Sequence, residues 1–115
     1  MKNRIIKKPW GSEELILINK DYCLKKLMMK KGHRCSLQFH KKKHETIYVL
    51  RGSLKIYFGK NKKRLKKKVL KKDGTIIIEP GTIHRMEAVN NAIYLEASTP
   101  QLKDVIRLSD DYKRV

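Results

Sequence analysis

The amino-acid sequence predicts an all-β fold, a small sandwich or barrel of antiparallel strands. Short apolar runs rich in Ile, Leu, Val and Tyr recur at close intervals, and Gly, Asn, Asp and Lys separate them. The length of 115 residues, of which 40% are hydrophobic, suits one domain with one modest core. We therefore expect a single domain over residues 1–115.

The predicted strands occupy seven apolar runs along the chain. They lie at residues 14–18, 23–29, 36–39, 46–50, 54–58, 75–78 and 92–95. The tripeptides at residues 51–53 and 72–74 each contain a Gly, which predicts tight hairpin turns. These turns connect neighbouring strands and so favour antiparallel pairing.

Two segments fit the strand pattern less well. Residues 60–72 are basic with only three apolar residues, which predicts a long hairpin or loop with solvated charges. This segment has no aromatic residue on which nucleic-acid bases could stack. Residues 100–115 are expected to form a short helix or an arm, because the apolar residues within 101–108 have nearly helical spacing.

The charge is strongly positive, with 29 Lys and Arg against 11 Asp and Glu, a formal net charge of +18. Such a field favours an anionic partner, for example a sugar phosphate, a nucleotide, RNA or an acidic membrane surface, although it can also serve solubility alone. Two Cys without a CxxC spacing indicate reduced thiols. No apolar run resembles a secretory signal or approaches a membrane span, so we expect a cytoplasmic protein without a membrane partner.

The densest chemical signal lies between Gly32 and Gly52. Gln38 and His40 are two residues apart, so a strand places both side chains on one face. Glu45 opens the next predicted strand, and His84 follows a Gly-containing turn at residues 80–83. One amide oxygen, two imidazoles and one carboxylate suit zinc, iron, manganese, cobalt or nickel. The alternative is that both His are ordinary strand residues and Gln38 is a hydrogen-bonded core amide.

The same residues resemble the cupin motifs. The first motif is matched throughout its spacing, with a Gln in place of the usual first His, by Gly32, Gln38, His40, Glu45 and Gly52. The second is matched with a loop one residue shorter, and with Ala88 where Asn is usual, by Gly74, Pro80, Gly81 and His84. The resemblance implies a jelly-roll barrel that binds one divalent metal on Gln38, His40, Glu45 and His84. A homodimer is the usual state of small cupins.

A narrower resemblance extends over almost the whole chain. It is to the cupin domain of type II phosphomannose isomerases, and it rests on residues 8–13 (KPWGSE), 36–40 (SLQFH), 84–87 (HRME) and 104–114 (DVIRLSDDYKR). The guanylyltransferase domain that often precedes this domain is not in the sequence, so we do not expect sugar-nucleotide synthesis. Departures from the family pattern are Lys43 for Arg, Lys113 for Gly, and residues 46–47 (Thr-Ile) for His-Trp.

This resemblance implies an aldose–ketose isomerase that acts on a sugar phosphate, foremost mannose 6-phosphate, through an enediolate. Zinc is the first choice of metal. Candidates for the general base are Lys43, His44 and Glu87. Arg107 and Arg114 are the first choices for the phosphate, followed by Arg85 and Lys43, because Arg binds phosphate bidentately. The alternative for Arg107 and Arg114 is a tail held by ion pairs to Asp104, Asp110 and Asp111.

Two other classes of function remain open from the sequence. One is a different cupin activity, namely an epimerase, a dioxygenase or a non-catalytic sugar-binding protein, because a fold does not determine its chemistry. The other is a nucleic-acid-associated protein, which only the charge suggests, and we expect no specific nucleic-acid partner. Metal content together with sugar-phosphate turnover would distinguish the isomerase from both.

Overall fold

The computed structural model describes residues 4–115, so residues 1–3 of the predicted domain lie outside the described part. The described residues form eleven β-strands and no helix, which confirms the predicted all-β class. The strands are β1 (Arg4–Lys8), β2 (Gly11–Ile18), β3 (Cys23–Met29), β4 (Leu37–Phe39), β5 (Glu45–Arg51), β6 (Leu54–Gly59), β7 (Lys66–Leu70), β8 (Thr75–Ile78), β9 (Ile83–Ala88), β10 (Ala92–Ser98) and β11 (Ile106–Ser109).

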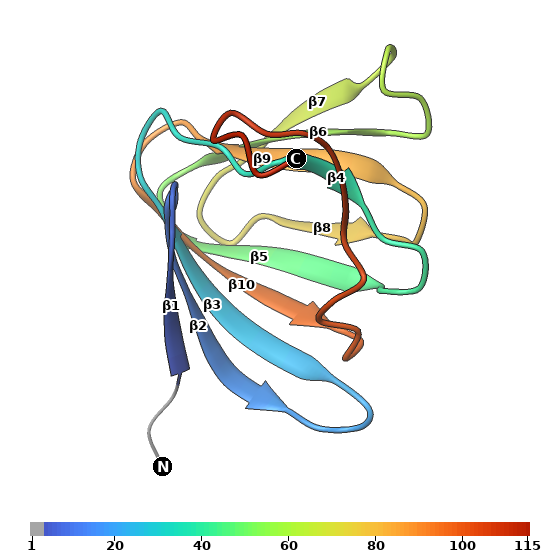
Figure 1. The fold of residues 1–115 in the computed structure, drawn as a ribbon. Coiled ribbons are helices and arrows are strands. Elements are labelled where there is room, and N and C mark those ends of the chain that lie inside the picture. Colours follow the sequence, from blue (N-terminus) through green and yellow to red (C-terminus); the bar gives the residue numbers. More distant parts are fainter. Residues whose placement is uncertain (1–3) are drawn as a thin grey trace.

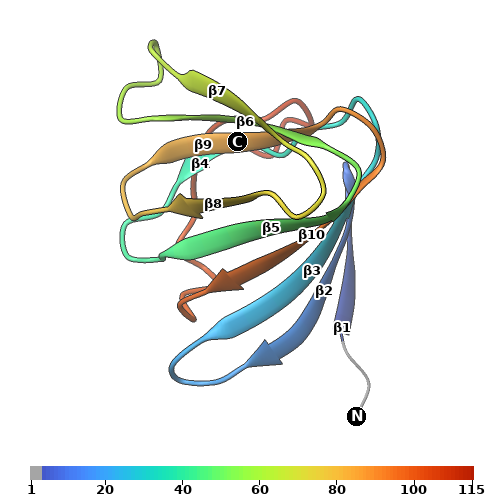
Figure 2. The same cartoon turned by 180° about the vertical axis from the view of Figure 1, so that it is seen from behind.

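The strands form two antiparallel sheets that face each other (Figures 1 and 2). One sheet has six strands in the order β1-β2-β3-β10-β5-β8, and the other has five in the order β11-β4-β9-β6-β7. Neighbours such as β3 and β10 are far apart in sequence, so the chain crosses repeatedly between the sheets. The order brings β4, β5 and β9, which carry the predicted metal ligands, to one region of the interior.

Burial alternates along the central strands, as expected for strands with one face toward a core. In β5, Glu45, Ile47 and Val49 are buried, whereas Tyr48 and Leu50, which point to the other face, are exposed. The same alternation runs through β3 and β10. Inward positions of both sheets meet in one apolar cluster that includes Ile47, Val49, Leu54, Ile56, Met86 and Tyr94.

Tight turns are present at both predicted positions, but neither closes a hairpin, because β5 and β6, and likewise β7 and β8, belong to different sheets. Gly52 joins β5 to β6 with a φ of +77°, in the left-handed region where a side chain is strained. A Cβ at this position would also lie 2.2 Å from the backbone oxygen of Asn91, so only Gly fits. The basic segment at residues 60–72 is a hairpin that leads from β6 into β7, an edge strand whose lysines are exposed.

The C-terminal segment forms an arm and not a helix. Residues after β10 leave the six-stranded sheet and cross to the five-stranded sheet, where β11 pairs with β4 (red segment in Figure 1). The nearly helical spacing of residues 101–108 is overridden because the backbone groups of Ile106 and Arg107 hydrogen-bond across to β4. In the described part of the chain, no helix is long and apolar enough to cross a membrane.

Candidate metal centre

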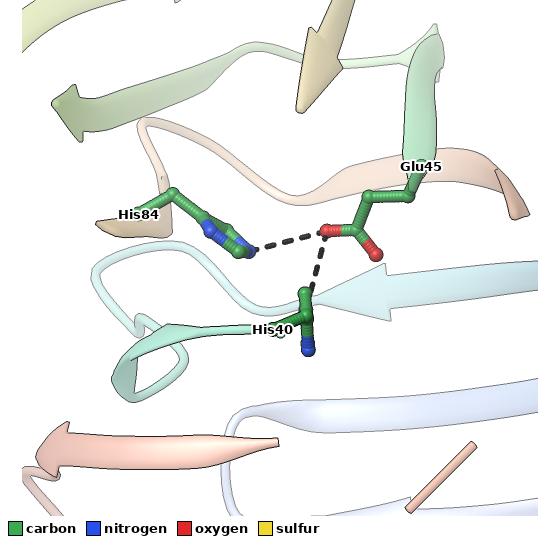
Figure 3. A group of neighbouring side chains, drawn as sticks. All are labelled: His40, Glu45 and His84. Carbon is green, nitrogen blue, oxygen red and sulfur yellow. Dashed lines mark ion pairs between the residues drawn. The ribbon is translucent and has the colours of Figure 1, made fainter. Parts of the chain in front are cut away.

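Three of the four predicted metal ligands converge inside the barrel. His40 directly follows β4, Glu45 begins β5 and His84 is the second residue of β9. One potential ligand atom from each lies within 4.8 Å of the other two. The Oε1 atom of Glu45 is 3.1 Å from Nε2 of His84 and 3.7 Å from Nε2 of His40 (Figure 3). All three side chains are at most 4% exposed.

The hydrogen bonds of the imidazoles fix which nitrogen faces the centre. Nδ1 of His40 donates to the backbone oxygen of Asp104 (2.5 Å), and Nδ1 of His84 donates to that of Thr82 (2.9 Å). A carbonyl oxygen can only accept, so Nδ1 carries the proton, and a neutral ring then has its lone pair on Nε2. Both Nε2 atoms are buried without a hydrogen-bond partner. This is the usual arrangement of metal-binding His.

A cation fits this donor set. Without one, two imidazole lone pairs and a carboxylate oxygen would face each other in a buried site, which is electrostatically unfavourable. Burial opposes ionisation of Glu45, but His40, His84 and Lys43 outweigh it and hold the pKa of the carboxyl well below its ordinary value. Two imidazoles and an ionised carboxylate are ligands that first-row divalent metals accept.

Gln38, the fourth predicted ligand, lies beside the other three. It faces His84 directly across the β4–β9 pairing, and it lines the same cavity as His40. Its Oε1 accepts a hydrogen bond from the hydroxyl of Ser36 (2.7 Å). A carbonyl oxygen has two lone pairs, so this bond leaves one free for a further partner.

Lys43 joins the centre to a second buried carboxylate. Its Nζ lies 3.1 Å from Oε2 of Glu45 and 2.9 Å from Oε2 of Glu96 on β10. Burial alone would lower the pKa of Lys43, but the two carboxylates overcome it and raise the pKa above its ordinary value. The pKa of Glu96 is raised, because burial and the charge of Glu45 outweigh the attraction of Lys43. Lys43 is therefore a fixed buried cation.

Asp104 holds the turn between β4 and β5. Its carboxylate accepts hydrogen bonds from the backbone N–H groups of Lys41, Lys42 and Lys43, at 3.1, 2.7 and 2.9 Å. These bonds hold the pKa of the Asp104 carboxyl below its ordinary value. Since its backbone oxygen also binds His40, one residue of the C-terminal arm positions both the turn and the first imidazole.

A cavity of about 140 Å³ adjoins the centre. Both Gln38 and His40 line it, together with the aromatic rings of Trp10 and Tyr94. Its charged wall consists of Lys8, Glu13, Lys25, Lys43, Glu96, Arg107 and Arg114. Five cations and two carboxylates give the cavity a surplus of positive charge suited to an anionic ligand.

The predicted phosphate-binding arginines separate into two groups. Arg107 and Arg114 line the cavity, and the Nε of Arg107 is buried without a hydrogen-bond partner. Arg114 is held by Asp110 at 2.7 Å. Arg85 is on the other side of β9, where it donates to the backbone oxygen of Cys35.

Two of the predicted general bases lie outside the cavity. The side chain of His44 is exposed, and its backbone pairs with Thr99. Glu87 is three residues after His84 in the same strand, so it occupies the opposite face, where it accepts a hydrogen bond from Tyr57. Lys43 reaches the centre, but as an ammonium held by two carboxylates it has no free lone pair with which to abstract a proton.

The sequence analysis did not single out Glu96, and it named Asp104 only as an ion-pair partner for the arginines of the tail. Both contact the turn at residues 41–44 from more than 50 positions away along the chain. The alternation of β10 places Glu96 on the same inward face as Ala92 and Tyr94, and a charged residue in that register was the available signal.

The family described as "Mannose-6-phosphate isomerase C-terminal" matches residues 1–110. The chain belongs to this family. The match extends through all the elements that build the centre, from β4 to β11. A search of curated protein sequences found no significant match.

Solved structures with the same fold are similar over nearly the whole chain. The capsular polysaccharide assembling protein CapF from Staphylococcus aureus has a TM-score of 0.82 at 17% identity, over 95% of this chain and 32% of its own. KdgF from Halomonas sp. has a TM-score of 0.76 at 13% identity, over 90% of this chain and 92% of its own. Oxalate decarboxylase from Bacillus subtilis has a TM-score of 0.77 at 19% identity, over 93% of this chain and 30% of its own. This chain spans about a third of the length of CapF and of oxalate decarboxylase. These similarities confirm the cupin fold.

Proposed function

We propose that this protein is a metal-dependent sugar-phosphate isomerase that interconverts an aldose phosphate and its ketose, with mannose 6-phosphate as the first candidate substrate. The observation that carries the proposal is the buried group of His40, Glu45 and His84 in a chain of the mannose-6-phosphate isomerase C-terminal family. Zinc is the proposed metal, because imidazole and carboxylate ligands in a small buried site suit it.

Different residues of the centre and its cavity would have different roles in such a reaction. His40, Glu45, His84 and Gln38 would hold the metal, which supplies a positive charge for substrate oxygens and for the negative charge that develops on them. The Lys43 ammonium adds a second fixed positive charge in a site from which water is largely excluded. Trp10 and Tyr94 supply apolar walls that restrict water.

The phosphate needs a cation that is not already committed. Arg107 meets this condition, since its buried Nε has no partner, whereas Arg114 is held by Asp110. A cavity of about 140 Å³ is smaller than the roughly 300–1,000 Å³ of typical ligand sites, so part of the substrate would extend beyond it. Arg107 and Arg114 are both partly exposed, which suits contact with that outer part.

The first experiment is a metal assay followed by an isomerase assay. The purified protein is analysed for metals, stripped with a chelator, reloaded with zinc, manganese, cobalt, nickel or ferrous iron, and assayed on mannose 6-phosphate. We expect about one metal per chain and turnover that depends on it. A protein that binds metal but isomerises no sugar phosphate would favour another cupin activity. Absence of metal binding would contradict the proposal.

The second experiment tests the phosphate contact. Arg107→Gln should raise KM for mannose 6-phosphate by about 10- to 100-fold, because one charge-assisted contact of this kind contributes about 1.5–3 kcal/mol. Its matched control is Arg51→Gln, an exposed arginine at the end of β5. An equal effect of both variants would mean that the overall charge, and not Arg107, attracts the substrate.

A further inference from the structure

We propose that Glu96 is the general base that moves the substrate proton between C2 and C1. This inference rests on the proposed isomerase function, and it assigns the role to a residue outside the sequence motifs.

Glu96 is buried next to the candidate metal centre. Its side chain is 8% exposed and lines the same cavity as Gln38 and His40. The Nζ atom of Lys43 contacts Oε2 of Glu96 and Oε2 of Glu45, so the two carboxylates lie on either side of one nitrogen. A substrate whose oxygens reach the centre would therefore bring C1 and C2 close to Glu96.

One oxygen of Glu96 is available for chemistry. Lys43 holds Oε2 at 2.9 Å, and among the described residues no hydrogen bond engages Oε1. The Lys43 contact fixes the carboxylate in place, as a general base requires. Burial, the first cause of the raised pKa of Glu96, makes the carboxylate a stronger base than an exposed Glu.

The other carboxylates that approach the cavity are committed elsewhere. Glu45 turns Oε1 toward the two imidazoles and Oε2 toward Lys43. Glu13 on β2 forms an ion pair with Lys25 at 3.2 Å. It is not part of the group of His40, Glu45 and His84. With His44 and Glu87 outside the cavity, Glu96 is the buried carboxylate best placed among the described residues.

The proton transfer balances without a further reactant. A carboxylate oxygen of Glu96 takes the proton from C2 of the aldose, and the C–H electron pair forms the C1–C2 double bond while the aldehyde oxygen gains a negative charge. A proton then passes from the oxygen on C2 to the oxygen on C1. The oxygen on C2 re-forms a carbonyl, and the double-bond pair takes the proton from Glu96 at C1. Lys43 remains protonated throughout.

Glu96→Gln tests the assignment. Glutamine keeps the shape and can accept the Lys43 hydrogen bond, but it is not a base. We expect kcat for mannose 6-phosphate to fall at least about 100-fold, the scale of general-base catalysis, with KM changed less than about threefold. Metal content, thermal midpoint and calorimetric affinity for fructose 6-phosphate should stay near the unmodified protein. NMR in D2O should show that exchange of the transferred hydrogen with solvent is lost.

Glu79→Gln is the control, since it removes an exposed carboxylate outside the cavity and should change kcat less than about threefold. Glu96→Asp, which keeps a carboxylate one methylene further away, should fall between Glu96→Gln and the unmodified protein. Turnover that survives Glu96→Gln, loss of metal in that variant, or an equal loss of turnover in Glu79→Gln would overturn the assignment of Glu96. Absence of turnover in the unmodified, metal-loaded protein would instead overturn the proposed isomerase function.

Discussion

The two ends of the barrel interior differ sharply, although the same strands build both. Along β5, the inward positions run from Glu45 to Ile47 and Val49. Along β9, the inward positions change from the polar His84 to the apolar Met86, two residues later. One end is thus a closed apolar core, and the other holds buried charges around a cavity. The apolar core therefore supplies the stability that lets the polar end keep unpaired groups.

The contrast also separates what each residue is for. At the apolar end, side chains such as Ile47 are fully buried among other hydrocarbons, so their removal should cost free energy of unfolding. At the polar end, the two Nε2 atoms have no hydrogen-bond partner among the described residues, so their removal should cost binding and little stability. The substitutions that follow test this division.

The largest expected effect is on metal binding at the polar end. His40→Ala should weaken metal affinity at least about 100-fold, because even outer-shell changes at metal sites cost about 10- to 100-fold. The metal-free protein should retain its β circular dichroism and unfold cooperatively. Elemental analysis and chelator competition measure the result. Unchanged metal content in His40→Ala would show that the assigned centre is wrong.

Ile47→Ala should have the largest effect on stability. Removing a fully buried side chain on β5 should lower the free energy of unfolding by about 2–5 kcal/mol. Leu50→Ala, on the exposed face of the same strand, is the control and should change it by less than about 1 kcal/mol. Denaturant titration measures both. If Ile47→Ala lost metal without losing stability, the division between the ends would fail.

A smaller effect is expected from pH at the arm. The Arg114 guanidinium and the backbone N–H of Arg114 lower the pKa of Asp110 to about 2, against an ordinary value of 3.8. A depressed folded-state pKa gives stability that is present above about pH 4 and lost as pH falls toward 2. On a plot of the free energy of unfolding against pH, the acid limb is the fall between about pH 4 and pH 2. Asp110→Asn should therefore reduce this fall by about 1–2 kcal/mol. An acid limb as steep as in the unmodified protein would contradict the role of this pair.

The smallest effect is expected on the basic hairpin. Lys68 is exposed on the edge strand β7, remote in sequence from the ligands. Lys68→Ala should change the free energy of unfolding by no more than about 0.5 kcal/mol and leave metal content unchanged. Thermal unfolding with elemental analysis checks both. A large loss in either quantity would show that the hairpin charges support the barrel or the centre.

The sequence predicted the parts of this molecule that depend on local spacing. The two-residue spacing of Gln38 and His40, and the turns before Glu45 and His84, needed only strand geometry. The two-residue repeat of a strand also explains why two candidates lie outside the cavity. Arg85 and Glu87 are one and three residues after His84, so they face the other side of β9.

Contacts between distant segments could not be predicted from spacing. The pairing of Lys43 with Glu96 depends on the register of β10 against β5. For the C-terminal segment, the local periodicity of residues 101–108 left open a helix or an arm, and pairing of a four-residue strand with β4 decides for the arm. Tertiary pairing of this kind outweighs the few tenths of a kcal/mol by which residue preferences differ.

The Asp104 contact makes the arm and the centre one thermodynamic unit. Because its carboxylate receives three successive backbone N–H groups and its carbonyl receives His40, opening of the arm releases the turn and the imidazole together. By linkage, a ligand that requires His40 in place must lower the population of the opened arm. The amide hydrogens of Lys41, Lys42 and Lys43 thus act as a built-in reporter, whose exchange with solvent slows in proportion to occupancy of a centre they do not touch.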